Sequence, residues 1–93
     1  MKRRFTGEVP KSIYTAEQEK LQALLRQIRT EAQLTQVELA KRLWRPQSFV
    51  SKYESGERRL DLVELRQVCE ALGTTLAKLT ARFERAIRGA RTK

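Results

Sequence analysis

Three times along the chain, a Thr or Asp is followed three positions later by Glu or Gln, just ahead of apolar residues at helical spacing. The three pairs are Thr15 and Gln18, Thr35 and Glu38, and Asp61 and Glu64. Each pair has the spacing of a capping box, in which two side chains satisfy backbone N–H groups at the start of a helix. No alternating run rich in Val or Ile predicts a strand. The sequence therefore predicts an all-α fold.

Stop signals between these starts divide the chain into five expected helices. Pro46 disfavours helical angles at the residue before it, so one helix should end near Leu43 or Trp44 and the next should begin at Pro46 or Gln47. Ser55-Gly56 is typical of a left-handed cap that ends a helix. The expected helices extend from Thr15 to Ala32, from Thr35 to Leu43 or Trp44, from Pro46 or Gln47 to Ser55, from Asp61 to Gly73, and from Thr74 or Thr75 to Gly89.

Basic residues are concentrated toward the two ends of the chain. Lys and Arg number 20 against 11 Asp and Glu, and the resulting net charge of +9 favours polyanionic partners. Residues 1–14 contain Lys2, Arg3 and Arg4 and show no helical periodicity, so we interpret them as a flexible basic arm. We expect residues 15–81 to form the folded domain and residues 82–93 to form a basic helical extension.

The residue types that are missing exclude several functions. The chain has one cysteine, Cys69, and no histidine, so we expect no internal disulfide, no conventional zinc site and no cofactor. No apolar run approaches the roughly 20 residues that span a bilayer, which predicts a soluble, cytoplasmic protein without membrane association. Without histidine or a Gly-rich phosphate loop, we expect no enzyme. Cys69 and Tyr53 are interpreted as core residues.

Two short helices joined by a tight turn, the first ending at Leu43 or Trp44 and the second beginning at Pro46 or Gln47, have the layout of a helix-turn-helix, which places its second helix in the major groove of DNA. The polar face of that second helix consists of Gln47, Ser48, Ser51 and Lys52. This face lies opposite Val50 and has no acidic residue before Glu54, as approach to phosphates requires. We predict that the four polar residues read base edges; an ordinary solvated helix face is the alternative.

The same segments resemble a known family. Leu34–Ala40 and Pro46–Gly56 are similar to the Cro and lambda-repressor type (XRE family) of bacterial and phage DNA-binding domains, and the similarity covers about residues 20–80. The resemblance implies a compact five-helix, lambda-repressor-like domain that binds double-stranded operator DNA as a homodimer and regulates transcription. It implies that Gln36 holds a phosphate and that Arg29 and Glu54 form a structural ion pair. It places three residues at base-reading positions: Gln47, Ser48 and Lys52.

Further phosphate contacts are expected from residues beside the two helices. The predicted phosphate-binding residues are Thr35, Gln36, Arg45, Arg58 and Arg59. For Gln36, the alternative to a phosphate clamp aided by the helix dipole is an ordinary residue of a first helical turn. Arg58 and Arg59 follow the reading helix, where a basic loop can contact the DNA backbone. Pairing of these arginines with Glu57 or Asp61 is the alternative.

The chain departs from the family in the turn, where Trp44 replaces a usual glycine and Arg45 replaces a usual apolar residue. A left-handed conformation at Trp44 would cost about 1–2 kcal/mol. We therefore expect a rebuilt turn in which the indole packs in place of the missing apolar residue. Such a turn would let Arg45 reach a phosphate or a base.

An apolar stripe on the last helix indicates how two copies could associate. A helix that extends beyond the core exposes its apolar residues unless something covers them. We predict that Leu79, Phe83 and Ile87 form a homodimer interface. The alternative is that the stripe packs on the first and fourth helices of the same copy.

The leading hypothesis is a sequence-specific transcriptional regulator, most simply a repressor, that binds a pseudo-palindromic operator as a homodimer. A controller of a restriction-modification system is a further role in the same class. The alternative is an antitoxin that binds a toxin protein and autoregulates its operon. Residues 1–14 or the stripe around Phe83 would then contact that protein partner.

Overall fold

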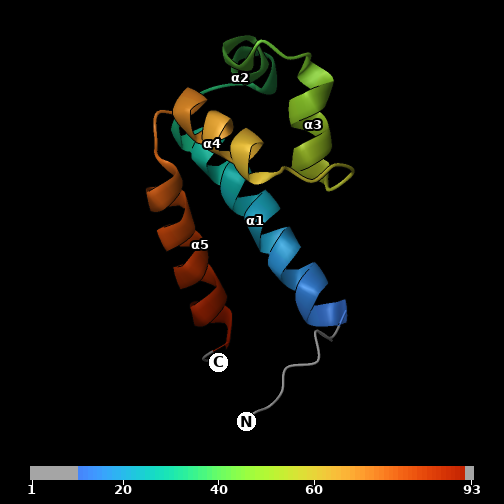
Figure 1. The fold of residues 1–93 in the computed structure, drawn as a ribbon, viewed down its shortest axis with the longest axis vertical. Helices are drawn as coiled ribbons and strands as arrows, with labels where there is room; N and C mark the ends of the chain where they lie inside the picture. Colours follow the sequence, from blue (N-terminus) through green and yellow to red (C-terminus); the bar gives the residue numbers. More distant parts are fainter. Residues whose placement is uncertain (1–10, 92–93) are drawn as a thin grey trace.

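All the regular secondary structure in the described part of the chain is helical. The computed structural model describes residues 11–91, with side chains over 15–89, and this range contains five helices and no strand (Figure 1). The helices are α1 (Lys11–Glu31), α2 (Gln36–Leu43), α3 (Gln47–Ser55), α4 (Leu62–Ala71) and α5 (Leu76–Arg91). The expected all-α fold with five helices is confirmed.

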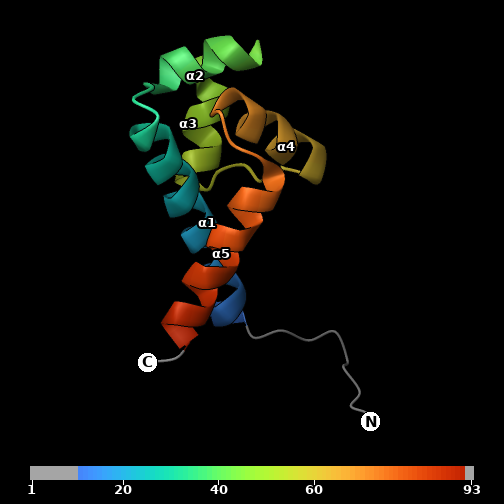
Figure 2. The ribbon, with the colours of Figure 1, turned by 90° about the vertical axis from the view of Figure 1, so that its left-hand side faces the viewer.

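The three short helices gather at one end of the molecule, around the C-terminal half of α1 (Figures 1 and 2). α3 packs on α2 and α1, while α4 packs on α2 and α5. α5 returns along the molecule and also packs on α1. Because its neighbours lie on one side, α3 keeps its other side exposed.

The hydrophobic core lies where the short helices meet α1 and α5. The largest fully buried side chains are Leu39, Leu79, Val50, Val68 and Cys69. Leu25 and Ile28 add the contribution of α1. Burying each large apolar side chain stabilises the fold by roughly 1.5–3 kcal/mol. Tyr53 and Cys69 are core residues as predicted, with 2% and 0% of their surface exposed.

Two of the three predicted capping boxes are present. Thr35 Oγ1 accepts from Glu38 N at 3.1 Å, and Thr35 N donates to Glu38 Oε1 at 2.8 Å. Asp61 Oδ1 accepts from Glu64 N at 2.7 Å, and Asp61 N donates to Glu64 Oε1 at 3.0 Å. These boxes fix where α2 and α4 begin, and so they fix the two helices that precede and follow α3 in the chain.

The predicted helix start at Thr15 is wrong. α1 begins at Lys11, so Thr15 and Gln18 lie inside a continuous helix rather than at its start. Residues 11–31 contain no Gly or Pro that would separate a start at Thr15 from an earlier one. Residues 11–14, which we expected in the arm, are therefore helical. Residues 1–10 lie outside the described residues, and with them the basic arm residues Lys2, Arg3 and Arg4.

The last helix continues beyond its expected end at Gly89, and α5 reaches Arg91. A side chain built at Gly89 would meet no other atom within 4 Å, so no neighbouring segment packs closely enough to require a glycine there. A glycine inside a helix costs only about 1 kcal/mol, which the surrounding helix tolerates. Residues 82–91 of the predicted basic extension are thus the second half of α5.

The turn between α2 and α3 also differs from the expectation. Trp44 adopts the left-handed conformation, with φ 57° and ψ 40°, and it is 91% exposed. The prediction of a rebuilt turn with a packed indole is therefore wrong. Arg45 N donates to Ala40 O at 3.0 Å and Trp44 N donates to Lys41 O at 3.2 Å. These bonds satisfy carbonyl groups at the end of α2, and they offset the cost of about 1–2 kcal/mol for the left-handed residue.

Candidate nucleic-acid interface

α3 exposes one polar side and buries the other. Four of its residues are buried against the rest of the molecule: Phe49, Val50, Tyr53 and Glu54. The four predicted base-reading residues are placed differently, since Gln47, Ser48 and Lys52 are exposed and Ser51 is half-buried. Gln47 is the first residue of α3, so it lies at the positive end of the helix dipole. The outward face of α3 is therefore polar and free of carboxylates.

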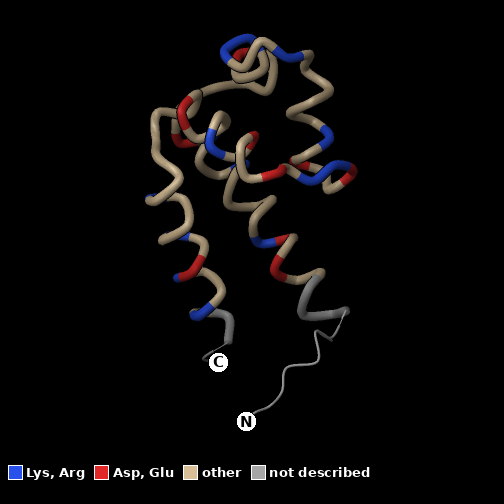
Figure 3. The backbone as a smooth tube through the Cα atoms, in the orientation of Figure 1, with Lys and Arg blue, Asp and Glu red and all other residues tan. Residues whose placement is uncertain are grey.

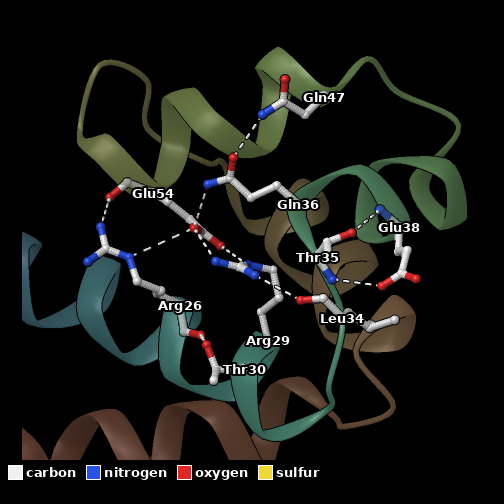
Figure 4. Close-up of polar contacts among 9 residues, drawn as sticks. All are labelled: Arg26, Arg29, Thr30, Leu34, Thr35, Gln36, Glu38, Gln47 and Glu54. Atoms are coloured by element: carbon white, nitrogen blue, oxygen red, sulfur yellow. Dashed lines mark hydrogen bonds and ion pairs between the residues drawn. The ribbon is translucent and has the colours of Figure 1, made fainter.

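A buried ion pair holds α3 against α1. Glu54 is 2% exposed, and its Oε2 and Oε1 accept from Arg29 Nε at 2.7 Å and Arg29 Nη2 at 3.1 Å (Figure 4). Arg29 Nη1 also donates to Leu34 O at 2.8 Å. The hydrogen bond to Glu54 is the main reason why the pKa of Arg29 is raised above its ordinary value. The ion pair that the resemblance implied is thus present, and it joins α1, α3 and the segment before α2.

Two glutamines extend this ion pair toward the exposed end of α3. Gln36 Nε2 donates to Glu54 Oε1 at 2.9 Å, and Gln47 Nε2 donates to Gln36 Oε1 at 2.8 Å (Figure 4). Gln36 and Gln47 are the first residues of α2 and α3. The structure therefore brings two helix N-termini together, and backbone N–H groups at helix N-termini favour anions such as phosphate.

Thr35 lies beside these glutamines as the N-cap of α2. Its hydroxyl oxygen accepts from Glu38 N, and its backbone N–H is used by the Glu38 carboxylate. The hydrogen bond from the Thr35 backbone N–H is the main cause that lowers the pKa of Glu38, and a hydrogen bond from the Thr35 side chain contributes. The Thr35 hydroxyl therefore serves the cap of α2, and a phosphate contact would compete with Glu38 for its hydrogen.

A second group of charges surrounds Phe49 at the other edge of α3. Glu64 accepts from Arg58 Nη1 at 3.0 Å and Arg58 Nη2 at 2.7 Å, and Arg45 Nη2 lies 3.5 Å from its Oε2. The guanidinium carbons of Arg45 and Arg58 lie 4.3 and 4.9 Å from the centre of the Phe49 ring. The hydrogen bonds from Arg58 are the main cause that lowers the pKa of Glu64 to about 2. Two predicted phosphate-binding arginines therefore share one carboxylate and one aromatic ring.

The role of Glu64 was missed in the sequence, where this residue was interpreted only as part of a cap. Its arginine partners come from the loop after α3 and from the turn before it, so no local spacing indicates the contact. Arg58 pairs with Glu64 rather than with either acid considered as an alternative, Glu57 or Asp61. Arg59, the remaining predicted phosphate-binding residue, is exposed and donates from Nη1 to Gln18 Oε1 at 3.4 Å.

Basic residues occur along α2 and its turn into α3, on α3 itself and in the loop that follows (Figure 3). The carboxylate of Glu54, the only acid within α3, points inward and is neutralised by Arg29. The exposed side chains of this region that carry positive charge include Lys52, Arg45 and Arg59. This arrangement gives the outward face of α3 a positive potential.

The predicted dimer stripe does not form an exposed surface. Leu79 is 1% exposed and Ile87 is 8% exposed, while Phe83 is half-buried and packs against the core of the same copy. The reason is that α1 and α5 pack against each other, so the apolar side of α5 faces its own chain. The prediction that Leu79, Phe83 and Ile87 form a homodimer surface is therefore corrected. These residues pack within one copy, as the alternative stated.

No helix in residues 11–91 is long and apolar enough to cross a bilayer. Within the same range, His, Cys, Asp and Glu side chains form no group that could bind a metal ion.

Comparisons with known proteins agree with this geometry. A family model described as Helix-turn-helix (HTH_3) matches residues 25–79, which is more than half of the chain. An XRE-family like protein from Pseudomonas syringae pv. tomato str. DC3000 is 46% identical, with a TM-score of 0.77, and the match covers 82% of this chain and 93% of that one. No curated protein matches the chain.

Two structures of the clp gene regulator ClgR from Corynebacterium glutamicum are also similar. One has 26% identity and a TM-score of 0.71, covering 82% of this chain and 81% of that one. The other has 28% identity and a TM-score of 0.68, covering 76% of this chain and 91% of that one. Fold, paired helices and matches together define a helix-turn-helix DNA-binding domain. The chain belongs to the XRE family, as its resemblance to that family predicted.

Proposed function

We propose that this protein is a sequence-specific transcriptional regulator that binds a pseudo-palindromic operator as a homodimer and acts as a repressor. α3 enters the major groove and reads base edges with four residues: Gln47, Ser48, Ser51 and Lys52. The half-sites are then centred about 34–36 Å apart, one helical turn of DNA. The similar protein ClgR is also a regulator by name, since it is called the clp gene regulator.

The observation that carries the proposal is the chain of hydrogen bonds from Arg29 and Glu54 through Gln36 to Gln47. It fixes the side chain at the tip of α3 before any DNA is met, so less conformational entropy is lost on binding. It also places the N-termini of α2 and α3 side by side, where a phosphate can be bound while α3 reads bases.

The predicted phosphate-binding residues lie at both ends of α3. Thr35 and Gln36 lie at the start of α2, and Arg45 lies in the turn before α3. Arg58 and Arg59 lie in the loop after α3. Contacts to phosphates from both sides would set the register of α3 in the groove, which base contacts alone do not do.

Selection of bound sequences from a randomised duplex pool at about 150 mM salt tests the proposal, because this salt suppresses purely electrostatic binding. We expect a motif with two-fold symmetry. Replacing Gln47 by Ala should relax the base preference at one position of each half-site and leave the rest of the motif. A pool without enrichment, or a Gln47→Ala profile equal to the wild-type profile, would contradict the assignment of α3.

The substitution Lys52→Ala gives a second test with a matched control. We expect about tenfold weaker binding to the selected duplex, because one contact from the outward face of α3 is lost. Lys78→Ala removes the same charge from the exposed side of α5 and should leave affinity almost unchanged. Fluorescence anisotropy with a labelled duplex measures both. Equal losses in the two variants would indicate that only net charge matters.

A second candidate function is that of an antitoxin, and the exposed apolar side chains favour it. Trp44, Leu62 and Val63 are 91%, 67% and 66% exposed, which leaves apolar surface available for contact with another protein. The test is a search for a neighbouring gene that encodes a small protein, followed by co-expression of that protein with this chain. Co-purification that is lost in Trp44→Ser, while DNA binding persists, would support the antitoxin role; absence of any complex would support the regulator alone.

A further inference from the structure

Glu54 lies too deep to touch DNA, yet it accepts a hydrogen bond from Gln36, which in turn accepts one from Gln47 at the first position of α3. Its side chain is 2% exposed, whereas Gln47 at the other end of the chain of hydrogen bonds is exposed. We propose that Glu54 is a positioning residue for base specificity, which acts through Gln36 to fix which end of the Gln47 amide faces the DNA. This inference rests on the proposed function of α3 as the reading helix.

The first step of the argument is the chemistry of the carboxylate. The Glu54 carboxylate forms an ion pair with the Arg29 guanidinium, and a carboxylate in an ion pair only accepts hydrogen bonds. Glu54 Oε1 lies 2.9 Å from Gln36 Nε2. If the Gln36 amide were reversed, its carbonyl oxygen would face the carboxylate with no hydrogen between them, which leaves two acceptors unsatisfied. Gln36 must therefore point its NH₂ group at Glu54 and its oxygen away.

The second step transfers this direction to Gln47. Gln36 Oε1, which now faces α3, can only accept, so Gln47 must offer its NH₂ group, and the observed contact is Gln47 Nε2 to Gln36 Oε1 at 2.8 Å. Two hydrogen-bonding groups of Gln47 remain unused by this chain: the carbonyl oxygen as an acceptor and one N–H as a donor. The direction of the outer amide is thus set by a charge two residues away in the hydrogen-bond chain.

The third step is the match to a base. In the major groove, adenine offers the N7 acceptor beside the N6 donor, and guanine offers two acceptors, N7 and O6. A Gln47 that presents one acceptor and one donor fits adenine. A reversed Gln47, with its oxygen bound to Gln36, would present two N–H donors and fit guanine. The charge at Glu54 therefore favours adenine over guanine at the base pair that Gln47 reads.

Replacing Glu54 by Gln keeps the size of the side chain and should reverse the direction of the hydrogen bonds, at the cost of the charge that neutralises Arg29. Arg29 has only donors and binds both carboxylate oxygens, so the new amide oxygen should take the position of Oε2, where the bond from Arg29 Nε is the shorter one at 2.7 Å. The NH₂ group would then take the position of Oε1, lose the 3.1 Å bond from Arg29 Nη2 and turn toward Gln36. Gln36 would then turn its oxygen inward and its NH₂ group toward Gln47. Gln47 would turn in the same way and present both N–H groups to the groove. A buried isosteric substitution is thus expected to change one base preference.

Sequence selection with four variants tests this inference, each at a temperature where circular dichroism shows the variant folded. For Glu54→Gln we expect the preference for adenine over guanine at the position read by Gln47 to fall about tenfold, with the other positions unchanged. Gln36→Ala breaks the chain and should flatten the same position without reversing it. Adding Gln47→Ala to Glu54→Gln should give the profile of Gln47→Ala alone.

Val68→Ala is the matched control, because it removes buried volume from α4 at a side chain that is 0% exposed and outside the hydrogen-bond chain. It should lower stability and leave the base profile intact. If Glu54→Gln weakens all positions together, as Val68→Ala would if stability alone mattered, Glu54 is only structural and the inference is overturned.

A measurement without DNA separates this inference from the proposed function. Scalar couplings across hydrogen bonds in the isotope-labelled free protein should connect Gln36 Nε2 with Glu54 Cδ, and Gln47 Nε2 with Gln36 Cδ. Couplings in the opposite direction would overturn the inference even if an operator motif is found. Couplings in the expected direction in a protein that selects no motif would overturn the proposed function, and with it any role of Glu54 in base reading.

Discussion

Two carboxylates hold α3 in place, and they lie in different surroundings. The side chain of Glu54 is 2% exposed and that of its partner Arg29 is 15% exposed. Glu64 is 14% exposed, and its partners Arg45 and Arg58 are 40% and 37% exposed. The first pair lies under α3, and the second lies over Phe49 beside it.

This difference in exposure implies that the two ion pairs have different roles. A buried pair cannot lose one partner without leaving an uncompensated charge away from water, so it fixes an arrangement firmly. A pair at the surface is screened by water and salt, so its members exchange partners at little cost. The buried pair is therefore suited to orient the reading side chains, and the exposed pair is suited to let its arginines turn from Glu64 to a phosphate.

The largest expected effect comes from breaking the buried pair. Arg29→Ala should lower the free energy of unfolding by about 3–5 kcal/mol, because Glu54 would remain buried without its main partner. Urea denaturation followed by circular dichroism measures the change. Arg26→Ala is the control, since Arg26 lies 3.9 Å from Glu54 with 58% of its side chain exposed, and it should cost less than about 1 kcal/mol. Similar losses in both variants would remove the distinction between buried and exposed partners.

A smaller effect is expected for the exposed pair, and it depends on pH. The folded state lowers the pKa of Glu64 from 4.5 to about 2, so the pair stabilises the fold above pH 4.5 and this stabilisation is lost as the pH falls to about 2. Because solvent screens the arginines, we expect the loss to be only about 1 kcal/mol.

Urea denaturation between pH 2 and pH 6 checks this expectation in the wild type and in Glu64→Gln. The variant should lack the part of the acid destabilisation that belongs to this pair. Glu19→Gln, at an exposed carboxylate of α1, should keep it. A Glu64→Gln curve parallel to the wild-type curve would show that the carboxylate is not bound to its arginines in solution.

The smallest effect is expected from a change beside α3 that touches neither carboxylate. Trp44→Gly relieves the left-handed strain at the turn and should stabilise the fold by about 0.5–1 kcal/mol, after the entropic cost of glycine is subtracted. Gly56→Ala at the other end of α3 should do the opposite, because φ is 92° and a Cβ would lie 2.6 Å from Gln22 Nε2. Denaturation followed by circular dichroism compares them. Destabilisation by Trp44→Gly would mean that the indole contributes to the turn.

How well a contact could be predicted from the sequence depended on how far apart its two residues lie along the chain. The caps at Thr35 and Asp61 were predicted correctly because they join residues three positions apart, followed by apolar residues that need a core. At Thr15 the same spacing gave a wrong prediction, because the spacing of the two residues alone does not distinguish the start of a helix from a turn inside a helix.

Longer contacts could not be derived from local patterns. The pair of Arg29 and Glu54 was found only through the resemblance, and the arginines that bind Glu64 were missed because the cap already explained that residue. The stripe on α5 showed that the helix has an apolar side but not which helix covers it. At Trp44 the expected cost of a left-handed residue led to the wrong turn, because the bonds that compensate this cost become visible only when the end of α2 is seen in three dimensions.

The turn also provides the protein with a natural optical reporter. Trp44 is the single tryptophan of the chain, and it lies next to the start of α3 with 91% of its surface in water. Its fluorescence should therefore change little when the chain unfolds, since the indole is already solvated. A shift of its emission on mixing with a duplex would instead signal that something has come to lie against the turn, so binding can be followed without any label.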